Sequence, residues 1–366
     1  MYLKNIALIN FKNYDQAEIE LIPKINCFVG NNGVGKTNLM DAIFYLSFCK
    51  SFFNPIDSQN IKHDTNFFVI QGNYNKDDKN ENINCSVKRN QKKLFKRNKK
   101  VYRKLSEHIG LFPLVMVSPA DISIIVGGSD ERRKYMNFVL SQFDKKYLTD
   151  VIKYNKALNQ RNTLLKQFVK KNTFDKDSLD IWTEQLIILS KTIYAKRVKF
   201  IEELIPVFSK YYEFISKGNE KVTLKYHSQL HNANLRELFE QSLQKDRILQ
   251  YTTVGIHKDD LDLLLMDYPI KKVGSQGQKK TYLMALKLAQ FDFIKNVNGF
   301  KPVLLLDDIF DKFDADRVKQ IIKLVSENYF GQIFITDTNK ERLNKVLKTA
   351  NIEYKIFEID NEGNIK

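Results

Sequence analysis

Eight consecutive residues near the N-terminus have the composition of a phosphate-binding loop. Residues 30–37 read Gly-Asn-Asn-Gly-Val-Gly-Lys-Thr, which fits the pattern G-x-x-x-x-G-K-[ST] at every position. Glycines let backbone N–H groups approach phosphate oxygens, Lys36 can reach the β- and γ-phosphates, and Thr37 can place its hydroxyl on Mg²⁺. We therefore expect a nucleoside triphosphate to be bound by Gly30, Asn31, Asn32, Gly33, Val34, Gly35, Lys36 and Thr37.

The residues on either side of this loop have the patterns of a strand and a helix. Residues 25–30 are mostly apolar, and Leu39, Ile43 and Leu46 recur at helical spacing within 38–49. A strand, a glycine-rich loop and a helix in this order form the context that the phosphate-binding pattern requires. The flanking elements therefore favour a nucleotide-binding loop over a chance glycine-rich turn.

A buried strand far along the chain is predicted to end in two acids. Residues 302–306 read Pro-Val-Leu-Leu-Leu, and Asp307 and Asp308 follow directly. Buried strands often end in Asp, so this pattern is weak alone, but a phosphate-binding loop works with a carboxylate that holds the metal ion. We expect Asp307 to help bind Mg²⁺, and Asp308 to orient or deprotonate the attacking water as the catalytic residue.

A third candidate site lies before a helix that is predicted to begin near Lys279. Residues 274–278 read Gly-Ser-Gln-Gly-Gln, and exposed N–H groups at a helix start can bind an anion. Ser275 is equally typical of a helix N-cap, and taken alone it favours the cap. Because Ser275 lies 32 residues before Asp307, we expect a second set of ATP contacts from Ser275, Gln276, Gly277 and Gln278.

The periodicity of the chain predicts an α/β fold with a helical insertion. Residues 3–9, 17–21 and 332–336 read as strands, residues 67–102 as β-hairpins, and residues 283–294 and 318–325 as helices. Between them, one apolar stripe runs from Val139 to Leu165 and a second from Leu179 to Leu204, before Pro206. We expect two antiparallel helices here, the second ended or kinked by Pro206, with the stripes as packing faces and not ligand sites.

Composition restricts the class of protein and its compartment. The 366 residues carry a formal net charge of +16, which favours a polyanion as partner, although a Lys-rich surface can also serve solubility alone. Cys27, Cys49 and Cys85 show no CxxC spacing, which opposes a disulfide framework or a zinc site and is typical of the reducing cytoplasm. We expect no signal peptide and no membrane span, because no apolar run approaches the roughly 20 residues that a bilayer requires.

The order of these motifs resembles the ABC superfamily, and their detail resembles its RecF family. The phosphate-binding loop, the signature at 274–278 and the acidic strand with Asp311-Lys312-Phe313-Asp314 occur in the superfamily's order, over residues 3–340. The stretches that resemble the RecF family are 10–14 (Asn-Phe-Lys-Asn-Tyr), 117–121 (Val-Ser-Pro-Ala-Asp), 130–133 (Asp-Glu-Arg-Arg) and 255–260 (Gly-Ile-His-Lys-Asp-Asp). The departures are Ile256 in place of a proline and Phe313 in place of a smaller aliphatic residue. Asp308 is the shorter acid that RecF-like chains use where most ABC proteins have Glu.

The resemblance implies an ABC-type ATPase head (residues 1–135 and 216–366) with an inserted all-α arm (136–215). It implies a homodimer in which Ser275 of one subunit caps the ATP held by Lys36 and Asp307 of the other. It also implies a weak, DNA-dependent ATPase of DNA repair, replication and the SOS response to DNA damage. Such a protein binds gapped, junction or single-stranded DNA and works with the mediators RecO and RecR to load the recombinase RecA.

One stretch is unusually basic and could serve DNA binding. Residues 86–104 contain ten Lys or Arg, no acid, and the interleaved aromatic residues Phe95 and Tyr102. Each phosphate that such a surface neutralises adds about 0.9 to the salt dependence of binding. A solvated hairpin whose lysines simply face water remains the alternative.

Other ATP-using classes fit the spacing less well. An SMC-type chromosome protein or another ABC-type DNA clamp is the alternative, but an SMC protein needs hundreds of residues of coiled coil. A transporter subunit carries its signature about 100 residues after the loop, whereas Ser275 follows Thr37 by 238 residues. The 52 residues after Asp314 are too few for a nuclease domain. An ATP-binding scaffold without hydrolysis also stays open.

Overall fold

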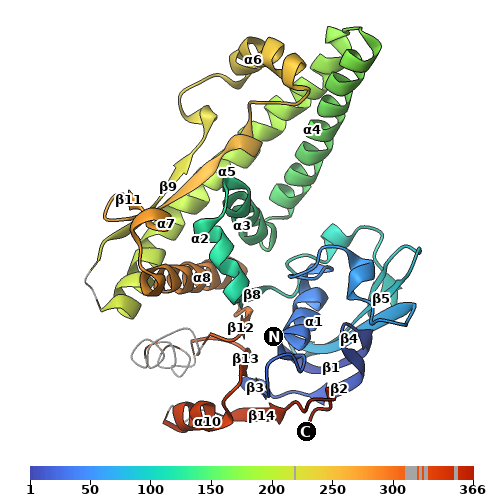
Figure 1. Ribbon diagram of the computed structural model, residues 1–366, viewed down its shortest axis with the longest axis vertical. Helices are drawn as coiled ribbons and strands as arrows, with labels where there is room; N and C mark the ends of the chain where they lie inside the picture. The colour runs from blue at the N-terminus through green and yellow to red at the C-terminus, as the bar shows by residue number, and fades with distance from the viewer. Residues whose placement is uncertain (218–219, 310–319, 321–323, 325–328, 350–352) are drawn as a thin grey trace. The chain divides into compact units, whose positions relative to one another are not determined.

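The computed structural model describes all residues except 218–219, 310–319, 321–323, 325–328 and 350–352 (Figure 1). The chain forms two compact units. Unit 1 comprises Met1–Asp121, Tyr211–Gly218 and Lys280–Lys366, and unit 2 comprises Ile122–Lys210 and Asn219–Lys279. Unit 2 thus takes in more than the expected arm at 136–215. It does so because the strands and the helix that follow the arm pair and pack within this unit.

Unit 1 contains a parallel sheet whose strand order is β14-β3-β13-β12-β8. Its strands are β3 (Ile25–Val29), β8 (Leu114–Val117), β12 (Val303–Leu306), β13 (Ile333–Asp337) and β14 (Tyr354–Glu358). Every residue of β3, β8, β12 and β13 is buried, as continuous apolar runs predict for a sheet covered on both faces. The carboxyl ends of β3, β12 and β13 are neighbours, so the loops that follow these strands meet at one edge.

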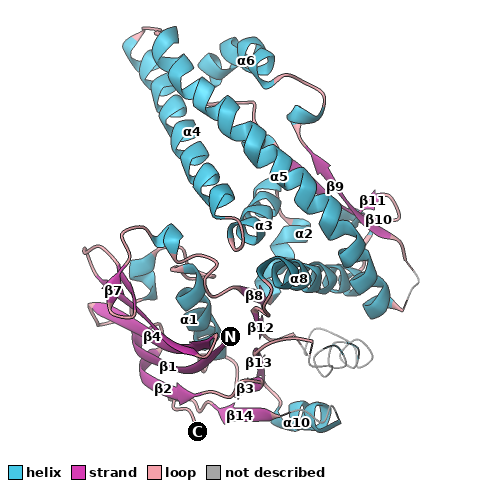
Figure 2. Ribbon diagram, turned by 180° about the vertical axis from the view of Figure 1, so that it is seen from behind, coloured by secondary structure: helices cyan, strands magenta, loops and turns pink. Residues whose placement is uncertain are grey.

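A second sheet of unit 1 is antiparallel, with the order β2-β1-β4-β5-β6-β7 (Figure 2). Its strands are β1 (Tyr2–Phe11), β2 (Tyr14–Glu20), β4 (Phe67–Lys76), β5 (Lys79–Lys88), β6 (Leu94–Arg97) and β7 (Lys100–Val101). The hairpins expected at 67–102 are therefore confirmed. Helix α1 (Lys36–Phe48) is buried along almost its whole length, and helix α10 (Lys340–Thr349) follows β13. Of the helix expected at 318–325, only residues 320 and 324 are described, and the stretch 311–314 lies outside the described residues.

Unit 2 is mainly helical. Its elements are α2 (Ser123–Val126), α3 (Ser129–Ser141), α4 (Lys145–Lys171), α6 (Leu235–Leu249), α7 (Ile270–Val273) and the small sheet β9 (Val222–His227), β10 (Asp260–Leu265) and β11 (Tyr268–Pro269). Helices α5 (Lys176–Ser216) and α8 (Gln276–Asn298) run through the boundary between the units.

The expected antiparallel helical pair is α4 and α5 (Figure 1). Arg161 of α4 donates to the Thr183 hydroxyl of α5 at 3.0 Å, within a buried ion pair to Asp246 of α6 at 2.7 Å. Helix α5 does not end at Pro206 but continues to Ser216. Leu204 and Phe208 are fully buried on either side of Pro206, and this packing offsets the hydrogen bond that a proline removes.

None of the helices in the described part of the chain is both long enough and apolar enough to cross a membrane.

Candidate nucleotide-binding site

The phosphate-binding loop connects β3 to α1, in unit 1, as the sequence predicts. Two of its residues, Gly33 (φ 87°) and Gly35 (φ 114°), have left-handed backbone conformations that favour glycine. The ammonium of Lys36 is enclosed by the loop: it donates to the carbonyl of Gly30 at 2.8 Å and to that of Asn31 at 2.9 Å, and the residue is 4% exposed. The loop therefore presents a cation and a helix N-terminus together, which is the chemistry that phosphate requires.

The turn between β1 and β2 supports the loop from behind. Asn13 donates its amide to the carbonyl of Val34 at 3.0 Å, and the Tyr14 hydroxyl donates to the carbonyl of Gly35 at 3.1 Å. A Cβ atom on Gly35 would lie 2.5 Å from the Asn13 amide nitrogen, so a larger residue there would have to displace the Asn13 side chain. Asn13 and Tyr14 belong to a family-like stretch of the sequence, but their supporting role was not predicted from it.

Asp307 lies directly beside the loop, at the carboxyl end of β12. The Thr37 hydroxyl donates to its Oδ1 atom at 3.0 Å, and the Thr336 hydroxyl donates to the same atom at 2.9 Å. Asp307 is 2% exposed, and this burial, together with the negative charge of Asp308, raises its pKa to about 6. A buried carboxylate of this kind gains from a cation, so Thr37 and Asp307 form a suitable pair of ligands for a hard metal ion.

Asp308 is half-buried and follows Asp307 in a left-handed backbone conformation (φ 47°). Its N–H donates to the Thr336 hydroxyl at 2.8 Å. The structure therefore places Asp307 against the loop, with Asp308 next to it in the chain, and adds Thr336 of β13 as a contact of both acids. The signal that could have identified Thr336 is its place at the end of a predicted strand, because parallel strands present their carboxyl ends at one edge.

The signature residues lie elsewhere, at the start of α8. Ser275 and Gln278 form a capping box: the N–H of Ser275 donates to Gln278 Oε1 at 2.6 Å, and the N–H of Gln278 donates to the Ser275 hydroxyl at 3.2 Å. The cap interpretation is thus correct for the local structure. Ser275 and Gln276 are exposed, whereas Gly277 and Gln278 are half-buried. Ser275–Gln278 belong to unit 2, and the phosphate-binding loop belongs to unit 1.

Residues 255–260 organise the interior of unit 2 through three pairs of side chains. Asp259 accepts from buried Arg197 at 2.7 Å, and Asp260 accepts from Arg132 at 2.7 Å. His257 Nε2 lies 3.0 Å from the carbonyl of Thr252, an acceptor only, so Nε2 carries the proton and Nδ1 accepts from the Tyr154 hydroxyl at 2.7 Å. Burial, chiefly, lowers the pKa of His257 to about 4.

The stretch at 117–121 has a similar internal role, in unit 1. Asp121 forms a buried ion pair with Lys287 at 2.6 Å and accepts from the N–H of Ser118 at 2.9 Å. Burial raises the pKa of the Asp121 carboxyl, and the Lys287 charge opposes that rise. Residues 117–121 therefore stabilise the interior of unit 1 and residues 255–260 that of unit 2. Their side chains bond within the units, which gives them a structural role.

The basic stretch at 86–104 occupies the end of β5, β6 and β7. Seven of its cations are exposed: Lys88, Arg89, Lys92, Lys99, Lys100, Arg103 and Lys104. Lys93 pairs with Asp57 at 2.7 Å and Arg97 pairs with Glu81 at 2.6 Å. Phe95 is 1% exposed, so it belongs to the core and offers no stacking surface.

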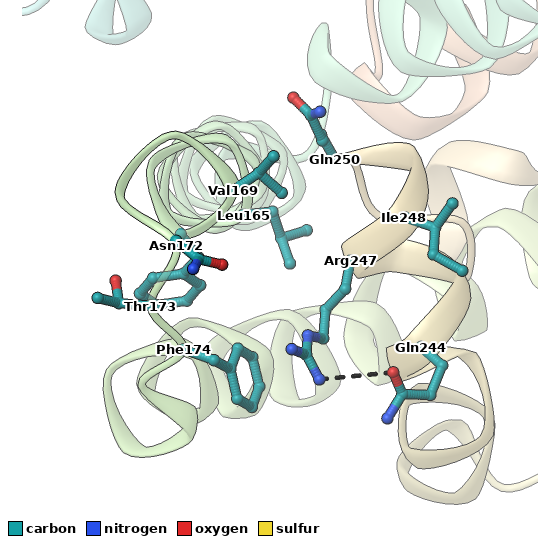
Figure 3. Close-up of a pocket in the computed structure, with 10 residues that line it drawn as sticks. Leu165, Val169, Asn172, Thr173, Phe174, Gln244, Arg247, Ile248 and Gln250 are labelled. Carbon is teal, nitrogen blue, oxygen red and sulfur yellow. Dashed lines mark hydrogen bonds between the residues drawn. The ribbon is translucent and has the colours of Figure 1, made fainter.

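A pocket of about 490 Å³ lies in unit 2, at the C-terminal ends of α4 and α6 (Figure 3). It is lined by Leu165, Phe168, Val169, Asn172, Thr173, Phe174, Gln244, Arg247, Ile248 and Gln250. Its one charged group, the Arg247 guanidinium, lies 4.0 Å from the centre of the Phe174 ring. Without a glycine-rich loop or a carboxylate, this pocket lacks the features that bind a triphosphate with its metal ion.

Comparisons with known proteins extend along the whole chain. Residues 2–361 match the RecF/RecN/SMC N-terminal domain family. The chain is 55% identical over 362 residues to DNA replication and repair protein RecF of Phocaeicola vulgatus, which covers 98% of this chain and 97% of that protein. It is 50% identical over 359 residues to the protein of the same name from Flavobacterium johnsoniae (98% and 100%).

Solved structures give the same result at the level of the fold. The structure of the recombination mediator protein RecF with ATP in the RecFOR pathway is similar with a TM-score of 0.90 and 33% identity, over 100% of this chain and 97% of that chain. An Smc head domain of Pyrococcus furiosus is similar with a TM-score of 0.57 and 16% identity, over 100% and 95%. The latter likeness concerns the fold alone, an α/β head with a long helical insertion, as expected from the sequence.

Proposed function

This chain belongs to the RecF/RecN/SMC N-terminal domain family and, within it, to the RecF proteins of DNA replication and repair; from that premise we propose that it is an ATP-controlled DNA-binding protein. It is a recombination mediator of the RecFOR pathway. The single observation that carries the ATP-dependent part is the meeting of Lys36, Thr37 and Asp307 at the carboxyl edge of the parallel sheet. The related structure with ATP supports the same ligand.

ATP fits the loop through groups that the structure already orients. The backbone N–H groups of residues 30–37 and the Lys36 ammonium would hold the β- and γ-phosphates. Thr37 and Asp307 would hold Mg²⁺, which supplies charge neutralisation for the phosphoryl oxygens. Asp308 would accept a proton from the attacking water or orient it. Its side chain is one methylene shorter than Glu, which is compatible with slow hydrolysis.

The signature gives the site its second half in a dimer. The Ser275 hydroxyl accepts the N–H of Gln278 within the cap, which leaves its own proton for another acceptor. In the proposed homodimer, Ser275 and Gln276–Gln278 of one subunit cap the ATP held by the partner. Dimerisation is then coupled to ATP, because the ligand contributes contacts to both subunits, and hydrolysis releases them.

DNA is the partner that the charge and the relatives support. The net charge of +16 and the seven exposed cations between residues 88 and 104 suit a phosphate backbone. Gapped, junction or single-stranded DNA is the proposed substrate. RecO- and RecR-type mediators are the proposed protein partners in loading the recombinase. Weak, DNA-dependent ATPase activity would reset the complex.

Light scattering of the purified protein tests this proposal. With Mg-ATP and a short gapped duplex, we expect a monomer to become a dimer and to retain DNA only in that state. Lys36→Ala should abolish ATP-dependent dimerisation, whereas Ser275→Arg should bind ATP and fail to dimerise. A particle that stays monomeric in every condition, or nucleotide-driven dimers of the Ser275→Arg protein, would refute the shared site.

A further inference from the structure

We propose that Thr336 is a positioning residue for hydrolysis, because its one hydroxyl fixes both acids of the site. This inference rests on the proposed function, since it concerns how Asp307 and Asp308 act on bound ATP and its metal ion. Thr336 is not proposed to touch phosphate or the attacking water. It acts through the two aspartates.

The Thr336 hydroxyl contacts both acids: Asp307 Oδ1 at 2.9 Å and Asp308 Oδ1 at 3.4 Å both lie within reach of its proton, and the contact to Asp307 is the shorter one. A hydroxyl has one proton to donate and can accept in addition. The proton of Thr336 goes to Asp307 Oδ1 at 2.9 Å, and the Thr336 oxygen accepts the N–H of Asp308 at 2.8 Å. Thr336 is itself fully buried, so water does not replace these bonds readily.

The bond to Asp307 fixes the orientation of the predicted metal ligand. Both Thr37 (3.0 Å) and Thr336 (2.9 Å) donate to the same oxygen, Oδ1. Two donors that converge on one oxygen restrict the rotation of the carboxylate. Partners of metal ligands commonly change metal affinity or activity by about 10–100-fold when they are removed.

The bond to Asp308 fixes the backbone of the predicted catalytic residue. Asp308 has φ 47°, a left-handed conformation that is uncommon for non-glycine residues, although Asp adopts it more readily than most. Its N–H is held by the Thr336 hydroxyl. Loss of that hydroxyl would free the backbone of Asp308 and displace its carboxyl from the reacting water.

The position of Thr336 in the sheet makes this role specific. β13 lies parallel to β12, with Ile335 paired to Leu306. Thr336 therefore follows at the level of Asp307, where both strands end. Valine has almost the same shape and suits a strand equally well, so Thr336→Val removes the hydroxyl alone.

The test compares Thr336→Val with Thr336→Ser and with a matched control, Thr281→Val. Thr281 is also fully buried in unit 1, and its hydroxyl has no hydrogen-bond partner among the described residues. We expect Thr336→Val to bind ATP without metal within about twofold of the unsubstituted protein. Its half-saturating Mg²⁺ concentration should rise about 10-fold, and its kcat should fall about 10–100-fold. Thr336→Ser should recover both within about threefold, and Thr281→Val should change neither.

Two results would overturn the inference. One is a folded Thr336→Val protein with the unsubstituted kcat and Mg²⁺ dependence. The other is a Thr336→Ser protein as impaired as Thr336→Val, which would assign the effect to packing. Thermal unfolding checks folding, and Thr336→Ala replaces Thr336→Val if the latter does not fold. An unsubstituted protein that neither binds nor hydrolyses ATP would instead refute the proposed function, and this inference with it.

Discussion

The Thr37 hydroxyl donates a 3.0 Å hydrogen bond to the carboxylate of Asp307, although 270 residues of sequence separate the two. Unit 2 and several strands of unit 1 lie between them in the chain. The parallel sheet closes that separation, because β3 and β12 both pair with β13 and end at the same edge. The order of strands in the parallel sheet therefore brings the residues of the candidate site together, and a substitution can test each contact separately.

Ser275→Asp separates the two roles of Ser275. Asp caps a helix about as well as Ser, so we expect the free energy of unfolding to stay within about 0.5 kcal/mol of the unsubstituted protein. A carboxylate would repel the γ-phosphate held by the partner subunit, so ATP-dependent dimerisation should be lost. Urea unfolding and light scattering measure the two effects.

Ser275→Asn is the matched control, since Asn also caps well but carries no charge. We expect it to dimerise with ATP. If Ser275→Asp dimerises equally well, Ser275 serves the helix cap alone.

Gly35→Ala and Gly33→Ala should differ in their cost to stability. Both glycines have positive φ (114° and 87°), so alanine strains the backbone at either site by about 1–2 kcal/mol. At Gly33 a Cβ atom meets nothing within 4 Å, whereas at Gly35 it lies 2.5 Å from the Asn13 amide. We expect Gly35→Ala to cost about 1–3 kcal/mol more, by urea unfolding, and to disrupt ATP binding further. Equal costs would show that Asn13 moves aside freely.

Local patterns predicted much of this fold. The loop at 30–37, the hairpins at 67–102 and the strand before Asp307 follow from short-range periodicity and glycine spacing, and the structure has all three. The full length of α5 could not be predicted from these local patterns. Propensity rules end a helix at Pro206, but the packing of Leu204 and Phe208 comes from residues distant in sequence.

Contacts between distant segments account for the parts that the sequence did not predict. Asn13, Tyr14 and Thr336 support the site through hydrogen bonds to residues 20 or more positions away. Asn13 and Tyr14 belong to a family-like stretch and Thr336 ends a predicted strand, but these local features do not show which residues the three contact. The full extent of unit 2 was likewise not predicted. Strands β9 and β10 pair within unit 2, whereas the sequence assigned both to the ATPase head at 216–366.

His257 should make stability depend on pH below neutrality. Its pKa is lowered to about 4, chiefly by burial and also by the charges of Lys258 and Arg133, while Asp246 opposes the shift. A lowered histidine pKa means that the unfolded state takes up the proton first. The contribution of neutral His257 to the free energy of unfolding is therefore complete above about pH 6.5 and is lost as the pH falls towards 4. At pH 5 the loss is up to about 2 kcal/mol.

Urea unfolding at pH 7 and pH 5 measures this effect against His257→Gln. The Gln side chain can donate to the Thr252 carbonyl and accept from Tyr154 but does not titrate in this range. We expect the drop in the free energy of unfolding between the two pH values to be smaller in His257→Gln by up to about 2 kcal/mol. Identical drops would mean that His257 is protonated in the folded protein at its ordinary pKa.

The exposed cations of the β6–β7 hairpin should contribute to DNA affinity through phosphate contacts. Lys99 and Lys100 are exposed at its turn, so Lys99→Ala/Lys100→Ala removes two charges at little cost to the core. If both contact phosphates, the slope of log K against log salt should fall by about 0.9 for each, whatever the base sequence. Lys345→Ala/Lys348→Ala removes two exposed charges of α10 and is the matched control. Salt titrations of gapped-duplex binding with Mg-ATP, by fluorescence anisotropy, would give both slopes. Equal slopes in the two double variants would favour the alternative that the stretch at 86–104 is a solvated hairpin. The DNA surface would then lie elsewhere on the protein.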